Sequence, residues 1–182
     1  MRLIKLTVLS SLIISLVLVT ASCEPDAEMK KVTDYEKKGI VMSGAQVVPA
    51  NSSAALGSMD VSYSKETHTL TYTVTWSGLA HSVANLRIHA LAHVGFPATA
   101  SPTFPTGVAQ VVVASSCGVY PQKTSGKFTY AKSGTLSGTL LADGVVVKEQ
   151  DILNGLYYIN IYPNTPATLA ATGEIRGQIK FQ

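Results

Sequence analysis

A strict alternation of apolar and polar residues between positions 69 and 76 constrains the fold most. Leu70, Tyr72, Val74 and Trp76 alternate with threonines at 69, 71, 73 and 75. Successive side chains of a β-strand point to opposite faces, so this segment predicts a strand with one face in a core and a threonine face outside. Residues 58–63 alternate in the same way, and residues 64–68 between the two segments are expected to form a hairpin loop.

Other segments of the chain have the same period of two. Further strands are expected at residues 40–47, 83–91, 108–114, 127–130, 135–141, 156–162 and 173–181. Asp143-Gly144 predicts a tight turn, prolines 97, 102 and 105 mark a long loop, and one short helix is expected at 148–153, closed by Asn154-Gly155. Many short strands joined by turns predict an all-β fold, an antiparallel Greek-key sandwich or barrel, with the strand order left open.

The N-terminus has the composition of a signal peptide. Arg2 and Lys5 precede an apolar run from residue 6 to 19, which ends in Thr20, Ala21, Ser22 and Cys23. This order predicts a lipoprotein signal peptide at 1–22, with Cys23 acylated and placed at the mature N-terminus. An uncleaved transmembrane helix and an ordinary secretory signal cleaved near Ala21 are the alternatives. Serines within the run disfavour the first, and the position of Cys23 disfavours the second.

Residues 23–38 carry charges of both signs and read as a flexible, lipidated tether that precedes a β domain at 39–182. We therefore expect the protein in a bacterial cell envelope, held by its N-terminal lipid in the outer membrane and facing the periplasm or the cell surface. Cys117 is then the only remaining thiol, which excludes an internal disulfide. Basic residues are scattered without interleaved aromatics, so nucleic acid is not an expected partner.

Four segments in order resemble one family. The C-terminal run at 172–179, TGEIRGQI, resembles the closing strand of the CHRD domain, the module first described in chordin. Residues 43–49 (SGAQVVP) are similar to its opening strand, 86–89 (LRIH) to its central strand and 155–162 (GLYYINIY) to its penultimate strand. The resemblance implies an immunoglobulin-like or Greek-key domain outside the cytoplasm. It implies no activity, because bacterial members generally lack an assigned one.

The family pattern also directs attention to possible metal ligands. Members typically have a His-x-His pair in the central strand and another histidine in the penultimate strand, and these could converge on one ion. Here the corresponding residues are Arg87, His89 and Tyr162. Tyr162 follows Asn160 by two residues. Arg87 is a permanent cation and cannot bind a metal. His89 and His93 alone fall short of the three or four ligands that zinc usually takes, so we expect a hydrogen-bonded, partly buried His89 and no cofactor. A metal-binding or redox protein using His89 and His93 stays the alternative.

Charged residues in the last strand suggest a second arrangement. Glu174 and Arg176 are expected on one face, where they form either a polar binding patch or charge pairs with neighbouring strands. The hypothesis for Arg87 is that it pairs with Glu174, or hydrogen-bonds to Asn160 and Tyr162, and so fills with a cation the place of a metal.

No nucleophile elbow, phosphate-binding loop or carboxylate pair is recognisable, which disfavours an enzyme. The sequence therefore predicts a lipid-anchored extracytoplasmic binding or structural module. Its strand faces and the proline-rich loop at 96–105 would be presented to a protein or glycan partner. The candidate binding residues are Arg87, His89, Asn160, Tyr162, Glu174 and Arg176.

Overall fold

The computed structural model describes residues 34–114, 124–125, 131–164 and 168–182. All of them belong to one compact unit, residues 33–182. The predicted signal peptide, Cys23, most of the predicted tether, Cys117 and the strand expected at 127–130 lie outside the described residues. Within the described ranges, no helix is both long enough and apolar enough to cross a membrane.

In the described residues, nine strands form one sheet in which every neighbouring pair is antiparallel. The strands are β1 (Asp34–Ser43), β2 (Leu56–Ser64), β3 (Thr69–Ser77), β4 (Val83–His89), β5 (Val108–Ala114), β6 (Thr124–Ser125), β7 (Gly134–Leu141), β8 (Tyr158–Pro163) and β9 (Ile175–Gln178). Short helical segments also lie between strands: η1 (Gly44–Gln46), α2 (Glu149–Leu153) and α3 (Thr168–Thr172).

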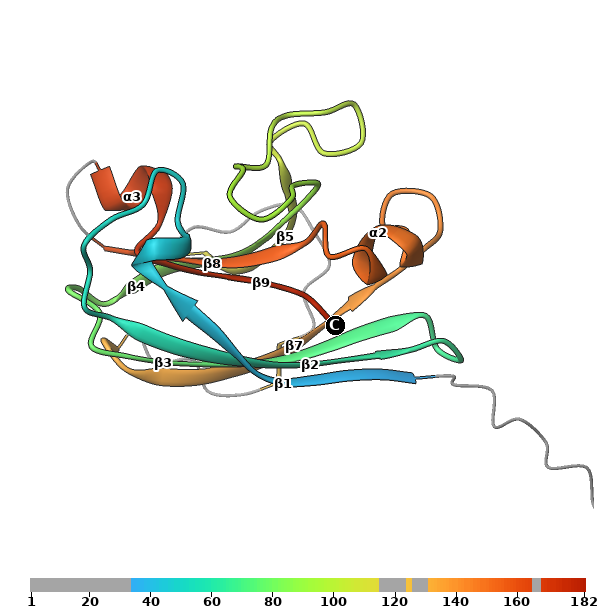
Figure 1. Ribbon diagram of the computed structural model, residues 1–182, viewed down its shortest axis with the longest axis horizontal. Helices are drawn as coiled ribbons and strands as arrows, with labels where there is room; N and C mark the ends of the chain where they lie inside the picture. The colour runs from blue at the N-terminus through green and yellow to red at the C-terminus, as the bar shows by residue number, and fades with distance from the viewer. Residues whose placement is uncertain (1–33, 115–123, 126–130, 165–167) are drawn as a thin grey trace, which may run out of the picture. The chain divides into compact units, whose positions relative to one another are not determined.

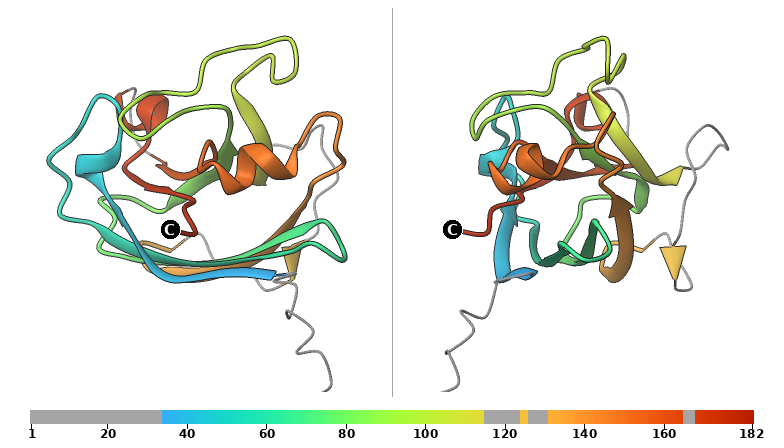
Figure 2. Two further views of the ribbon diagram at one scale, coloured as in Figure 1. Left: turned by 45° about the vertical axis from the view of Figure 1, so that its right-hand side comes forward. Right: turned by 90° about the vertical axis from the view of Figure 1, so that its right-hand side faces the viewer.

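The sheet folds into two facing layers. Its strand order is β5-β4-β8-β9-β1-β2-β3-β7-β6, and Figure 1 shows β4, β8 and β9 above β1, β2, β3 and β7. Figure 2 shows the same two layers from other directions. The connections from β3 to β4 and from β7 to β8 cross between the layers. The prediction of an all-β, antiparallel Greek-key sandwich or barrel is confirmed.

The hydrophobic core lies between the layers and uses the alternation seen in the sequence. Leu70, Tyr72, Val74 and Trp76 of β3 are at most 2% exposed, whereas the threonines between them face outward or are half-buried. The opposite layer contributes side chains such as Ile88, Ile159, Ile161 and Ile175 to the same cluster. Burial of these large apolar side chains is the main stabilising contribution in such a fold.

Two glycines of β7 make room for two aromatic rings of β3. Gly138 pairs with Tyr72 and Gly134 pairs with Trp76. A Cβ atom at Gly134 would lie 2.7 Å from a ring carbon of Trp76, and one at Gly138 would overlap the Tyr72 hydroxyl. The rings therefore cover the glycine backbone, which fixes how β3 and β7 align.

The first strand differs from the sequence prediction at both ends. β1 begins at Asp34, so residues 34–38 of the predicted tether are strand, and it ends at Ser43 before η1. Pairing of residues 34–37 with β2 and a ring contact between Tyr35 and Phe181, 5.8 Å between centroids, hold this polar segment in the sheet. The helix expected at 148–153 is α2, while η1 and α3 were not predicted because they are too short to show a helical period.

Candidate functional site

Strand register brings the candidate residues of the upper layer into two rows. Arg87 of β4 lies opposite Asn160 of β8, which lies opposite Arg176 of β9. In the neighbouring row, His89 lies opposite Tyr158, which lies opposite Gln178. Directly opposed residues share a face of the sheet. Because the residues between them, such as Ile88 and Ile159, fill the core, the two rows lie on the other face of this layer.

This second face is polar but mostly buried. His89 is 7% exposed, Asn160 3% and Arg176 2%. The loop between β4 and β5 lies above β8 in Figure 1, and hydrogen bonds join it to this face. Ala98 N donates to the Tyr158 hydroxyl (3.1 Å), and Gln178 Nε2 donates to Ala92 O (2.8 Å). The side chains of the rows therefore hold the loop in place.

A cavity of about 640 Å³ lies between this loop and the sheet. Five of the six candidate residues line it, together with Tyr158 and residues of the loop and of α3. The lining includes Arg87, His89, Asn160, Tyr158, Tyr162, Arg176, Pro97, Ala98, Pro105, Thr106, Val108, Val111, Ala171 and Thr172. Its volume is in the range of small-molecule sites.

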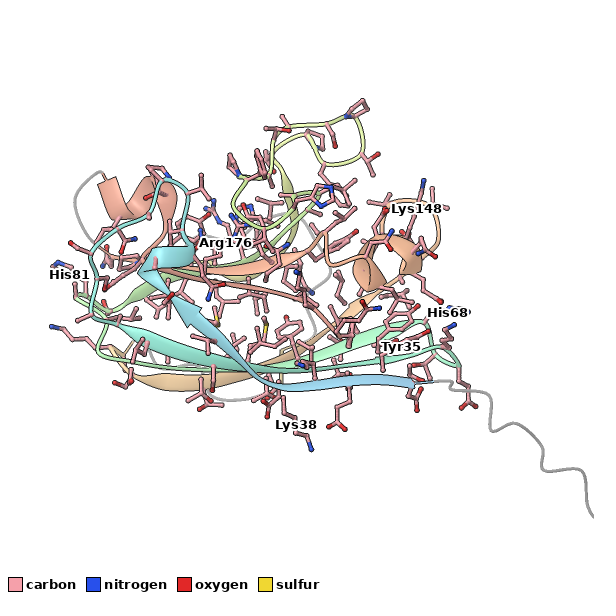
Figure 3. All side chains as sticks on the ribbon, viewed as in Figure 1. Tyr35, Lys38, His68, His81, Lys148 and Arg176 are labelled. Carbon is pink, nitrogen blue, oxygen red and sulfur yellow. The ribbon has the colours of Figure 1, made fainter. Side chains whose placement is uncertain are left out.

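Five of these side chains form a continuous stack with an arginine at each end. The Arg87 guanidinium carbon lies 4.9 Å from the centroid of the Tyr162 ring, and the Tyr162 and His89 centroids are 5.9 Å apart. His89 is stacked on Tyr158 at 4.8 Å with 9° between the planes, and the Arg176 guanidinium carbon lies 3.6 Å from the Tyr158 centroid. Cation–π contacts thus fix both ends of this five-residue stack. Arg176 is labelled in Figure 3.

His89, at the centre of the stack, is held in its neutral form. Its Nδ1 lies 3.1 Å from Gly107 O, and since a carbonyl only accepts, Nδ1 carries the proton. Nε2 therefore accepts from the Tyr162 hydroxyl at 2.8 Å. Burial lowers the pKa of His89 to about 4; the positive charges of Arg87 and Arg176 act in the same direction, and the hydrogen bond to Gly107 opposes them.

The metal-binding alternative has little support from this geometry. Both ring nitrogens of His89 already have hydrogen-bond partners. His93 is exposed and does not line the cavity, and its backbone oxygen accepts from Arg176 (3.4 Å). Within the part of the chain that the structure describes, no group of three or more His, Cys, Asp and Glu side chains is placed to hold an ion.

The two arginines of the cavity have no carboxylate partner among the described residues. Arg176 donates through Nη1 to Phe96 O and through Nη2 to Gln178 Oε1, both at 2.8 Å. These acceptors are neutral, and burial lowers the pKa of Arg176. Arg87 packs on Tyr162, yet its buried Nε has no hydrogen-bond acceptor in the described ranges. Among the residues that the structure describes, no acidic one lines the cavity.

Glu174 is the candidate that does not line the cavity. It is fully buried, and its Oε1 accepts from Ser53 Oγ (2.7 Å) and from Ala80 N (2.9 Å). Of the partners hypothesised for Arg87, Glu174 is therefore not one, whereas the Tyr162 ring contacts Arg87 and Asn160 lies opposite it. Glu174 precedes β9, so the strand parity that links it to Arg176 in the sequence does not extend to it. Its carboxylate instead joins the segment before β2 to the segment after β3.

Sequence reasoning missed Tyr158 and the loop residues over the cavity. Tyr158 could have been found, because Tyr158, Asn160 and Tyr162 alternate in one strand and so share a face. Pro97, Ala98, Pro105 and Thr106 gave no such signal, because a loop has no period that shows where it folds back.

Comparison with known proteins agrees with the fold. The CHRD domain family model matches residues 39–179, so the chain belongs to the CHRD domain family. The matched region contains the whole cavity, and the resemblance inferred from the four motifs is confirmed. No curated protein and no solved structure matches the chain.

Proposed function

We propose that this protein is a lipid-anchored binding module of a bacterial cell envelope, and that its ligand enters the cavity beneath the loop at 90–107. The observation that supports this most is the convergence of Arg87, His89, Asn160, Tyr162 and Arg176 from three strands on one cavity. Burying so many polar groups costs folding free energy. A binding site is a physical reason to retain them. Membership of the CHRD family supports an extracellular binding or structural domain.

The ligand we propose is a sugar or the end of a peptide, presented by a glycan or protein partner. A cavity of about 640 Å³ accommodates one such unit. Beside it, Phe96 of the covering loop is 65% exposed and Val94 is 53% exposed. Neighbouring exposed apolar side chains are typical of surfaces that contact a partner. The loop at 96–105 would then contact the partner around the bound unit.

Obstruction of the cavity tests this proposal. Ala98 lines the cavity and is half-buried, so Ala98→Trp places a large ring inside it. A panel of monosaccharides, oligosaccharides and short peptides is screened for shifts in the thermal unfolding of the wild type. We expect Ala98→Trp to abolish any binding found. Val145→Trp, at a position 75% exposed and outside the cavity, is the matched control and retains it. Equal binding by both variants contradicts the proposed site.

A further inference from the structure

The cavity has an uncompensated positive charge. Arg87 and Arg176 both line it, and neither forms an ion pair with a carboxylate in the described residues. Glu174, which directly precedes β9, directs one carboxylate oxygen to Ser53 and Ala80 and does not line the cavity. Each guanidinium group lies against a tyrosine ring without an anionic partner, so its lost hydration is not compensated by an opposite charge, and a bound anion would offset that cost.

Two of the four buried side-chain atoms without a hydrogen-bond partner in the described ranges lie in the same row, and the other two, the Tyr157 hydroxyl and Glu174 Oε2, lie outside the cavity. Arg87 Nε is a buried donor without an acceptor, and the Oδ1 atom of Asn160 is buried without a donor in the described ranges. Arg87 and Asn160 lie directly opposite each other on β4 and β8. By contrast, Arg176 already donates to Phe96 O and Gln178 Oε1, so it contributes mainly charge. The guanidinium of Arg87 is thus the group available for a new partner.

We propose that the cavity binds an oxyanion, the carboxylate or phosphate group of a small organic ligand, through Arg87, with Arg176 supplying the second positive charge. This inference rests on the proposed function in placing a ligand in the cavity. Guanidinium groups recognise such oxyanions through paired, charge-assisted hydrogen bonds. The body of the ligand lies against Pro97, Pro105 and Val111, which line the same cavity. Tyr158 is stacked on His89 and contacts Arg176, and the Tyr162 ring contacts Arg87, so these rings position the arginines.

Titration calorimetry of the purified full chain, with galacturonate, acetate, inorganic phosphate and neutral galactose as probes, tests the inference. Galacturonate and galactose form a matched pair that differs by a carboxylate. We expect at least one anion to bind and galactose to bind at least about tenfold more weakly than galacturonate, since a charge-assisted hydrogen bond is worth that factor. Comparison of acetate, galacturonate and phosphate shows whether the anion alone suffices, whether a sugar body is needed, or whether phosphate is preferred.

Two variants that each remove one positive charge show where the anion binds. Arg87→Gln should weaken anion binding at least about tenfold, whereas Lys148→Gln, which removes an exposed lysine outside the cavity, should leave it unchanged. Arg87→Lys keeps the charge but lacks the forked donors of a guanidinium group, so its affinity for the anion should lie between those of Arg87→Gln and Lys148→Gln. Lys148 is labelled in Figure 3, on the segment that precedes α2.

A second readout does not depend on heat of binding. Burial is the main cause of the low pKa of His89, and the charges of Arg87 and Arg176 lower it further. A bound oxyanion offsets those charges, so the pKa should rise from about 4 in the presence of a binding anion. Imidazole nitrogen resonances recorded against pH measure this change. The shift should be absent in Arg87→Gln and present in Lys148→Gln.

Each negative result has a distinct meaning. No binding of any anion at about 10 mM, well above a millimolar dissociation constant, overturns the inference. Anion binding that Arg87→Gln leaves unchanged also overturns it, because the anion then binds elsewhere. Galactose binding as tightly as galacturonate, and lost in Ala98→Trp, overturns the oxyanion while the proposed binding function stands. The proposed function itself would fail if Ala98→Trp bound the probes as tightly as the wild type does, because binding would then occur outside the cavity.

Discussion

At the scale of single residues, His89 determines how the site responds to pH. Its neutral ring accepts from Tyr162 and donates to Gly107, and it separates two tyrosines that support the two arginines. Protonation would place a third positive charge between Arg87 and Arg176 and would convert Nε2 from an acceptor to a donor facing a hydroxyl group. The surroundings of His89 therefore favour neutral imidazole.

The stability of the protein should consequently fall in mild acid. The pKa of His89 is about 4 in the folded protein, whereas histidine in an unfolded chain has a pKa of about 6.5. Between these values the unfolded state binds more protons, so the free energy of unfolding decreases as pH falls from about 6.5 to about 4. The loss due to this residue should be about 3 kcal/mol. Urea unfolding at a series of pH values in this range measures it.

A variant without the histidine separates this effect from general acid sensitivity. His89→Gln should lose most of the decrease in stability across that range, although it is less stable than the wild type near neutral pH. His81→Gln, at an exposed position after β3, should retain the full decrease. Identical pH dependence of the two variants would show that His89 does not cause the effect.

At the scale of elements, the turn between α3 and β9 is shaped to fit β8. Gly173 has a φ of +90°, and a Cβ atom there would overlap the side-chain amide of Asn160. Asn160 Nδ2 donates to Thr172 O at 2.8 Å, so the same amide also holds the end of α3. The turn can approach β8 this closely only because position 173 has no side chain.

Substitution of this glycine should therefore cost more than backbone strain alone. Gly173→Ala combines an unfavourable φ with overlap on Asn160, whereas Gly144→Ala has a similar φ of +75° and no neighbour within 4 Å of the added Cβ. We expect the free energy of unfolding to fall by about 1–3 kcal/mol more in Gly173→Ala than in Gly144→Ala. Urea titration of the two variants gives the difference. Equal losses would mean that the Asn160 contact contributes nothing.

Part of the arrangement of these elements could be predicted from the sequence. Alternation in β3 predicts its buried face, and the spacing of Arg87 and His89, or of Asn160 and Tyr162, correctly predicts shared faces within β4 and β8. Which rows lie side by side depends on strand order and register, and these result from long-range pairing. Glu174 was misplaced because parity applies only inside a strand, and β9 begins one residue later. The covering loop was unpredictable because its position depends on hydrogen bonds that Arg176 and Gln178 donate to it and that the Tyr158 hydroxyl accepts from it.

At the scale of the whole molecule, the proposed lipid anchor explains where such a binding site would work. Cys23→Ala removes the thiol that is expected to be acylated, and the mature protein should then appear in the soluble fraction instead of the membrane fraction. Cys117→Ala, which removes the other cysteine, should leave the protein with the membranes. Immunoblots of separated fractions measure the distribution. Membrane retention of Cys23→Ala would exclude this anchor.

The junction between β1 and β9 connects the cavity to the rate at which this strand pair opens. A single residue pair, Ser43 with Arg176, joins these strands and so connects the two layers of the sheet. The backbone of Arg176 belongs to that junction, while its side chain lies in the cavity and supports Tyr158. Strand pairs with few hydrogen bonds open most often, and their amide hydrogens exchange with solvent first. A ligand that immobilises Arg176 would therefore slow hydrogen exchange at Ser43, on a strand that does not line the cavity.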